Sequence, residues 1–445
     1  MSRHEAPLRA PGGQPFGRTL LVGAGPAAVH TAVQLSRGWC TELGLANRPG
    51  AHSVRLKEEL QRSGQTLYSI VQAERCRHLS GEAKLSRFHV SFAEVEEGWQ
   101  TLVLCTPSDS YREILEALRA DSRRELRTII LLSPAIGSNL LVRSLLGSAG
   151  DRVEVVSLSN YYAATKWEPG RDSVIHAYTK ACKKRVYLAS SGAAAGAAAA
   201  FAAFMESMGI GCRTAAGPVE AESRNITTYV HPPLLLSDFS LDAILSERDT
   251  KKSMYKLYPE GPITPHTIRT MVLLWKEISS LVEALGAAPL NLLQFLNDDN
   301  YPVHEQTLSR ADIEGFLVHE PVKQEYLLYV RYASILIDPF SEPDEHGRYF
   351  DFSAVPYRRV ELAADGTWSV PRIPHEDYRR LTGLRALARK AGVGIPTAES
   401  LIAGYERSLT AFAERTGRPA GAAYSPAPLE DADADRIWKE WQRSR

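Results

Sequence analysis

The first half of the chain, up to about residue 222, alternates short apolar runs with stretches of helical periodicity. Short apolar runs that end in turns containing glycine or proline are typical of buried strands. We expect strands within residues 19–25, 43–50, 101–109, 127–137, 153–165, 183–191 and 211–217, and helices within 27–38, 111–120 and 192–208. Strands alternating with helices favour a parallel sheet with both faces covered. Residues 18–222 are therefore predicted to form an α/β domain.

After residue 222 the pattern changes to long amphipathic segments, which indicate a mostly helical second domain over residues 223–418. We expect its helices within residues 236–247, 266–286, 322–338 and 401–416, and a hairpin formed by 347–362 and 366–374. Residues 1–17 are polar and rich in glycine and proline, so they are expected to form a flexible tail. Residues 419–445 are expected to form a loose tail with a short terminal helix.

Composition limits the partners of the chain. Lys and Arg together number 52, as do Asp and Glu, so bulk charge favours neither nucleic acid nor an anionic membrane. The sequence has neither the apolar core of a signal peptide nor a run of about 18 apolar residues, and we expect a cytoplasmic protein without a membrane span. None of the five cysteines forms a Cys-x-x-Cys pair, so neither a disulfide framework nor a metal site is predicted.

A glycine-rich turn follows the first predicted strand. Gly23, Gly25 and Ala28 form the pattern G-x-G-x-x-A between this strand and the first helix, with Pro26 inside the turn. The first glycine permits the tight turn, the second lets the backbone approach a pyrophosphate, and the small third residue lets helix and strand pack closely. The alternative is a strand–turn–helix without a ligand, but the placement favours a dinucleotide site.

The end of the second strand distinguishes NADP from NAD. Enzymes that use NAD usually carry an acid there, but no acid occurs between Leu43 and Lys57. Arg48 is suited to a 2′-phosphate, and Asn47 and Ser53 can donate further hydrogen bonds. The pattern predicts NADPH, although Arg48 as a solvated surface residue remains the alternative.

Two further loops are predicted to border the nicotinamide. Thr106 and Pro107 follow the third strand, and Ser133, Pro134 and Gly137 follow the fourth. Ligands of doubly wound sheets bind outside the carboxyl ends of the strands, where these loops lie.

The second domain offers a candidate acid/base group. Reduction of a carbonyl or imine needs a proton donor, and histidine suits this role because it titrates near neutrality. His231 is the best placed of the twelve histidines, since it lies at the domain change directly before two prolines. Glu325 and Asp338 are acids on otherwise apolar helices and could be its partner. A structural histidine and solvated acids remain the alternatives.

Long motifs give the chain a resemblance to a known family. From Leu20 to about Tyr405 it resembles the opine dehydrogenases that complete nicotianamine-like bacterial metallophores, such as the staphylopine, pseudopaline and bacillopaline dehydrogenases. The motifs that carry the resemblance are VGAGPAAV, QTLVLCTPSDSY, SLSNYYAATK, RNITTYVHPPL, YKLYPEGPIT, LLQFLNDDNYPV, QEYLLYVRYASILIDPFS and GRYFDFSAVP.

The resemblance implies a fold and a reaction. It implies a Rossmann-like domain followed by a largely helical catalytic domain, usually in a homodimer. Members use NADPH to condense a 2-oxo acid with the primary amine of an aminobutyrate-extended histidine. Arg48 matches the family's 2′-phosphate arginine, and His231 matches its acid/base histidine by position. The partner carboxylate would be Asp338 or Glu325.

One motif bears on the substrates. In SLSNYYAATK, family members that use pyruvate tend to carry Asp where this chain has Ala164. Ala164 leaves room for a second carboxylate, which Lys166 could attract, and Tyr162 of the same motif is a further candidate for substrate binding. We therefore expect 2-oxoglutarate rather than pyruvate, unless Ala164 merely packs.

Two other function classes remain open. A 2-keto or 2-hydroxy acid reductase would consume NADPH without an amine, and a non-catalytic NADPH sensor would turn nothing over. In the opine dehydrogenase interpretation, the carboxylates, amines and imidazole of the product could bind Zn²⁺, Ni²⁺ or Co²⁺.

Overall fold

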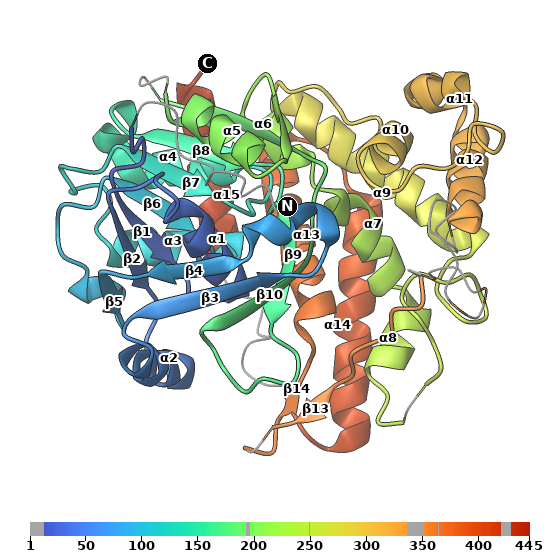
Figure 1. Ribbon diagram of the computed structural model, residues 1–445. Helices are drawn as coiled ribbons and strands as arrows, with labels where there is room; N and C mark the ends of the chain where they lie inside the picture. The colour runs from blue at the N-terminus through green and yellow to red at the C-terminus, as the bar shows by residue number, and fades with distance from the viewer. Residues whose placement is uncertain are drawn as a thin grey trace. The chain divides into compact units, whose positions relative to one another are not determined.

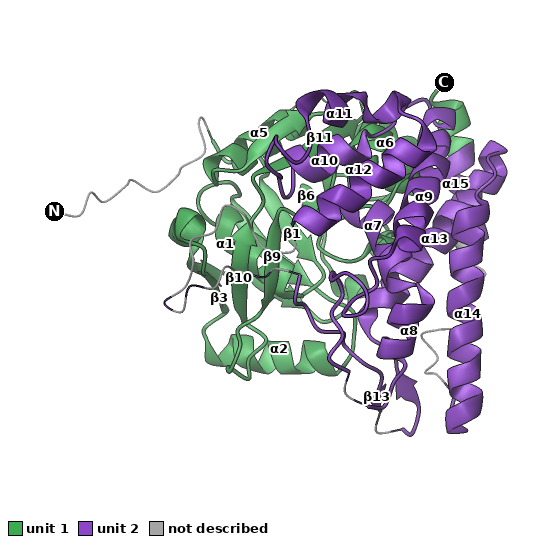
Figure 2. Ribbon diagram, turned by 90° about the vertical axis from the view of Figure 1, so that its right-hand side faces the viewer, with its two compact units in different colours: residues 1–224, 439–445 green, residues 225–438 purple. Residues whose placement is uncertain are grey.

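The computed structural model describes residues 13–192, 196–248, 250–335, 345, 347, 351, 353–363, 365–419 and 429–445. It divides the chain into two compact units (Figure 2). Unit 1 comprises Met1–Arg224 and Lys439–Arg445, and unit 2 comprises Asn225–Trp438. The first change of unit falls next to the predicted one at residue 222.

The core of unit 1 is an eight-stranded sheet of order β12-β11-β8-β7-β6-β1-β2-β5 (Figure 1). All neighbouring pairs are parallel except β11 with β8, which are antiparallel. The strands are β1 (Arg18–Val22), β2 (Glu42–Ala46), β5 (Arg87–His89), β6 (Thr101–Leu104), β7 (Thr128–Leu131), β8 (Glu154–Leu158), β11 (Arg185–Ser191) and β12 (Gly211–Thr214). The expected α/β fold with a Rossmann-like core is confirmed, but its sheet is not wholly parallel.

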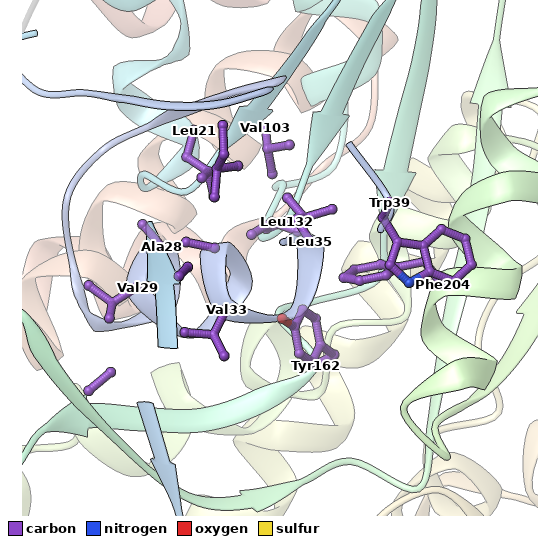
Figure 3. Packing of buried hydrophobic residues seen from close by; sticks show 14 of the residues in the cluster. Leu21, Ala28, Val29, Val33, Leu35, Trp39, Val103, Leu132, Tyr162 and Phe204 are labelled. Atoms are coloured by element: carbon purple, nitrogen blue, oxygen red, sulfur yellow. The ribbon is translucent and has the colours of Figure 1, made fainter. Parts of the chain in front are cut away.

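Helices cover both faces of this sheet because the strand residues are apolar on both sides. Leu21 of β1 packs in one cluster with α1 (Pro26–Leu35) and α5 (Ala197–Ser207), as Figure 3 shows for α1. Leu20 and Val22 point the other way and pack with α3 (Tyr111–Ala117) and α4 (Ser138–Leu146). Two further helices of this unit are α2 (Ala51–Arg62) and α6 (Pro218–Ser223).

A second sheet, which the sequence pattern did not predict, packs on α1. Its order is β4-β3-β10-β9, with β3 (Thr66–Val71), β4 (Gly81–Lys84), β9 (Ala163–Trp167) and β10 (His176–Cys182). The single strand expected over 153–165 is therefore two strands in different sheets, β8 and β9. The chain passes through β9 and β10 before it returns to the large sheet, so β8 and β11 are not joined by a helical crossover and run antiparallel.

Enclosure between the two sheets buries polar groups of α1. His30 is fully buried, and its Nδ1 lies 2.8 Å from Ser69 Oγ on β3. This burial lowers the pKa of His30 to about 3, so the imidazole is neutral at physiological pH.

Unit 2 is mostly helical. Its helices are α7 (Ile226–Leu235), α8 (Asp238–Ile244), α9 (Pro265–Ala284), α10 (Leu292–Asp298), α11 (Arg310–Glu314), α12 (Pro321–Ser334), α13 (Arg372–Ala391) and α14 (Pro396–Thr416). Helix α9 buries one side through Ile268, Val272 and Trp275 and contacts α7, α12, α13 and α14. The predicted hairpin has only two-residue arms, β13 (Glu361–Leu362) and β14 (Trp368–Ser369), because its second arm gives way to α13.

The last helix, α15 (Leu429–Arg443), ends in unit 1, and its final residues have the colour of that unit in Figure 2. Its Glu440 side chain is 5% exposed and accepts a 3.0 Å hydrogen bond from Arg143 Nε of α4. The end of the chain is thus fastened to unit 1. Across the described part of the chain, every helix is too short or too polar to span a membrane.

Candidate functional site

The turn between β1 and α1 needs glycine at two positions for different reasons. Gly23 has a φ of +97°, and a Cβ there would lie 2.5 Å from Thr106 Cγ2. A Cβ on Gly25 would meet open space, so the backbone at this residue is accessible to a ligand. These are the two roles of the first two glycines in a dinucleotide-binding turn.

The N-terminus of α1 is suited to an anion. Pro26 occupies the first turn, which contains no acid, and no side chain among the described residues caps the helix. Its free N–H groups and helix dipole favour a phosphate. Thr106 Oγ1 is buried beside Gly23 without a hydrogen-bond partner among the residues described, so it can bond to a ligand. Pro107 is exposed in the same loop.

The loop after β2 fits a 2′-phosphate. Arg48 is exposed, and the first turn of α2 contains no acid. Asn47 Nδ2 donates a 2.7 Å hydrogen bond to Ser53 Oγ, which itself donates to the Arg48 carbonyl at 2.6 Å. The Ser53 hydroxyl therefore fixes the shape of the loop. Together the turn, Arg48 and Thr106 form a set that fits NADP(H).

A buried acid fixes the loop after β7, which the sequence predicts to border the nicotinamide. Glu222 of α6 accepts 2.8 Å hydrogen bonds from the backbone N–H groups of Gly137 and Asn139 and from Ser157 Oγ. Its complete burial raises the pKa of Glu222 to about 7. Sequence reasoning missed this role because α6 is a short helix of ordinary polarity.

Unit 2 holds a row of three side chains centred on His231. His231 Nδ1 lies 3.5 Å from Asp377 Oδ2, and His231 Nε2 lies 3.3 Å from the Tyr255 hydroxyl. The Asp377 side chain is only 2% exposed. Histidine with a buried carboxylate on one nitrogen and a hydroxyl on the other is an arrangement suited to acid/base chemistry.

Arg380 holds the other side of Asp377. Its Nη1 lies 3.4 Å from Asp377 Oδ1 and donates a 3.1 Å hydrogen bond to Thr227 Oγ1. Arg380 follows Asp377 by one turn of α13, and Thr227 precedes His231 by one turn of α7. The two helices that carry His231 and Asp377 are therefore also joined by this guanidinium.

Nearly the whole chain matches one family. The sequence model of staphylopine dehydrogenase matches residues 17–440. The chain belongs to this family of opine dehydrogenases. Pseudopaline synthase of Pseudomonas aeruginosa (strain UCBPP-PA14) is 47% identical over 427 residues, covering 96% of this chain and 98% of that protein. Yersinopine synthase of Yersinia pestis is 37% identical, covering 95% of this chain and 98% of that protein.

A solved structure agrees with the family assignment. The structure of yersinopine dehydrogenase with NADP⁺ bound superposes with a TM-score of 0.87 at 35% sequence identity, covering 97% of this chain and all of that chain. The chain is thus an oxidoreductase with a nicotinamide cofactor.

The structure corrects the expected partner of the enzyme's His231. The prediction of Glu325 is wrong, because its carboxylate pairs with Arg269 Nε at 3.9 Å, whereas Asp377 lies beside His231. Asp338 lies outside the described residues. Sequence reasoning missed Asp377 because it is one acid on a polar helix, α13, whose start was assigned to the hairpin.

The motif expected to bind substrate divides into two parts. Ala164 and Lys166 both lie exposed on one face of β9, with the Lys166 ammonium 5.7 Å from the centroid of the Tyr178 ring. Tyr162 instead packs in the core of unit 1, and its hydroxyl lies 3.1 Å from Thr31 Oγ1 (Figure 3). The prediction that Tyr162 binds substrate is therefore wrong, since the side chain is fully buried under α1. Among the described residues no group of three or more His, Cys, Asp and Glu side chains could hold a metal.

Proposed function

We propose that this opine dehydrogenase uses NADPH to join 2-oxoglutarate to the primary amine of an aminobutyrate-extended histidine. The observation that carries the proposal is the Tyr255–His231–Asp377 row, which supplies acid/base chemistry in unit 2. The proposed reaction needs a hydride from the cofactor and proton transfer by this row.

The cofactor preference rests on Arg48. In NADPH, the 2′-phosphate adds charge that a guanidinium can bind through two parallel hydrogen bonds. No acid of the first turn of α2 opposes it. When bound, the nicotinamide supplies the hydride that reduces the imine carbon.

His231 carries out the proton transfers of the proposed reaction. The amine adds to the oxo acid to give a carbinolamine, which loses water to form an imine; hydride and a proton then give a secondary amine. His231 Nε2 takes the proton from the attacking ammonium or amine and returns one as water leaves. Asp377 Oδ2 lies 3.5 Å from Nδ1, where its charge favours a proton on that nitrogen and so leaves Nε2 free to act as the base.

Tyr255 occupies the position next to the reacting nitrogen of His231. Burial raises the pKa of Tyr255, so its hydroxyl stays protonated and can donate to Nε2. We propose that the substrate amine displaces or shares this hydroxyl when it binds.

The oxo acid preference rests on β9. Ala164 and Lys166 share an exposed face of this strand, so a small side chain and a cation lie next to each other. A second carboxylate, present in 2-oxoglutarate and absent from pyruvate, would fit beside Ala164 and gain from the charge of Lys166. The product could then bind Zn²⁺ or a similar metal through its carboxylates, amines and imidazole.

We also propose that the enzyme is a homodimer. Unit 2 exposes Val318, Val322 and Tyr326 to the extents of 86%, 78% and 65%. Val322 and Tyr326 are one turn apart on α12, so they form part of one apolar surface that a second copy could cover.

The test is to follow NADPH absorbance with the purified protein, the histidine-derived amine and either oxo acid. We expect oxidation that requires the amine and is faster with 2-oxoglutarate than with pyruvate. Oxidation without the amine would indicate an oxo acid reductase, and no oxidation under any combination would indicate a sensor. A faster rate with pyruvate would contradict the role of Ala164.

A further inference from the structure

Unit 2 contains a cavity of about 570 Å³ next to the groups described above. It lies among α7, α8, the turn that carries Tyr255, the segment before β13 and the start of α13. Its apolar lining includes Leu235, Ile244 and Met254. Cavities of this size with apolar walls and few polar groups are the usual sites of small ligands.

The cavity adjoins the Tyr255–His231–Asp377 row. Leu235, which lines the cavity, follows His231 by four residues on α7 and therefore lies on the same face one turn away. Ile373, on another wall, comes four residues before Asp377 at the start of α13. Tyr255 belongs to both the cavity and the row, since it lines the cavity and its hydroxyl lies 3.3 Å from His231 Nε2.

The charged groups of the cavity are mostly cationic. Arg358, Arg359 and Arg372 contribute to its lining, against one acid, Glu361. Arg372 Nε pairs with Glu376 at 2.7 Å, and Arg359 Nη1 donates to the Glu247 carbonyl at 3.4 Å. Arg358 is exposed and forms no ion pair with the residues that the structure describes, so its guanidinium is available to an anion.

We propose that this cavity binds the carboxylate-bearing end of the amine substrate. The inference rests on the proposed function and adds a specificity site to it. An apolar floor with a guanidinium at its edge suits an organic anion that also carries a ring or methylene chain. A substrate anchored there extends past Tyr255, so its amine reaches His231 Nε2. Arg358 and the cavity thus select amines that carry a carboxylate on the side away from the reacting nitrogen.

Two probes that lack the reacting amine test the site directly. N-acetyl-L-histidine carries the imidazole and the carboxylate, whereas N-acetylhistamine carries the imidazole alone. In calorimetric titrations of the full-length protein with NADPH present, we expect N-acetyl-L-histidine to bind about ten-fold more tightly or better. Arg358→Glu should abolish this preference, because it replaces an attractive charge with a repulsive one. The exposed Arg407 of α14 lies outside the cavity lining, so Arg407→Glu should keep it.

Kinetics provide the second readout. In Arg358→Glu the KM for the amine should rise about ten-fold, while the KM for the oxo acid stays within about two-fold. Equal binding of the two probes to the wild type, or a preference that survives Arg358→Glu, would overturn the cavity assignment. A wild type that binds the probes as expected but shows no amine-dependent oxidation would overturn the proposed reaction and leave the anion site standing.

Discussion

At the scale of single residues, His231 is defined by what contacts its two nitrogens. Asp377 lies on the Nδ1 side and Tyr255 on the Nε2 side, and Arg380 holds the far oxygen of Asp377. Nδ1 thus faces a buried carboxylate, and Nε2 faces a hydroxyl that a substrate can replace. Orientation and tautomer of the ring depend on Asp377.

Removal of the negative charge at Asp377 should therefore affect catalysis more than binding. We expect Asp377→Asn to lower kcat by about 10²–10⁴-fold with smaller changes in KM, since the amide can stabilise the wrong tautomer of His231. Steady-state kinetics at saturating substrates measure this effect, with circular dichroism to verify folding.

Glu325 offers a matched control for the assignment. Glu325→Gln should retain nearly wild-type kcat, because the side chain pairs with Arg269 at the surface. If Glu325→Gln lost activity and Asp377→Asn kept it, the assignment of the carboxylate would be reversed.

Arg48 should control the choice of cofactor. In Arg48→Ala, we expect the ratio of kcat/KM for NADPH to that for NADH to fall about ten-fold or more, mainly through a higher KM for NADPH. Lys57→Ala, on the exposed side of α2, should leave the ratio unchanged. An unchanged ratio in Arg48→Ala would mean that another group binds the 2′-phosphate.

The residues that could be predicted from sequence are those whose function depends on neighbours in the chain. Gly23, Gly25 and Ala28 form a local motif, and Arg48 is recognised by its distance from them. Asp377 could not be found in this way, since it reaches His231 only after α7 and α13 pack together. Tyr162 was wrongly predicted to bind substrate, because a sequence motif does not reveal which of its side chains point into the core.

At the scale of elements, periodicity predicted seven of the eight strands of the large sheet, all except β5, and the long helices α9, α12 and α14 of unit 2. It missed the second sheet because β3, β4 and β10 are only partly buried and lack the continuous apolar character of the buried strands. It also missed α13, whose buried residues are separated by many charged ones.

Glu222 links elements of unit 1, and its titration should make the free energy of unfolding depend on pH. The pKa of Glu222 is about 7 in the folded protein, against an ordinary glutamate value of 4.5, so folding takes up a proton between these values. The contribution of Glu222 to the free energy of unfolding is therefore fully present below about pH 4.5. It declines by up to about 3 kcal/mol as the pH rises towards and beyond 7.

A neutral substitution should remove this pH dependence. Between pH 5 and pH 8, we expect the Tm of the wild type to fall relative to that of Glu222→Gln, by several degrees in thermal unfolding experiments. Glu220→Gln, on the same helix but paired with Arg224, should not change the slope. A constant difference in Tm between wild type and Glu222→Gln would show that Glu222 does not titrate in this range.

At the scale of the whole molecule, the exposed apolar surface of α12 bears on assembly. Light scattering after size-exclusion chromatography should give the mass of a dimer for the wild type and a shift towards monomer for Val322→Glu, because a charge in an apolar interface is costly. Leu362→Glu, at another exposed apolar position, should keep the wild-type mass. A monomeric wild type would contradict the proposed dimer.

The C-terminal helix also bears on how the protein is made. Unit 1 includes the last seven residues, Lys439–Arg445, and Arg143 of α4 has its carboxylate partner, Glu440, in that segment. These residues follow unit 2 in the chain, so they are synthesised long after the rest of unit 1. Unit 1 therefore cannot complete its packing until unit 2 has been synthesised, and a premature stop shortly before residue 439 would leave Arg143 without this partner.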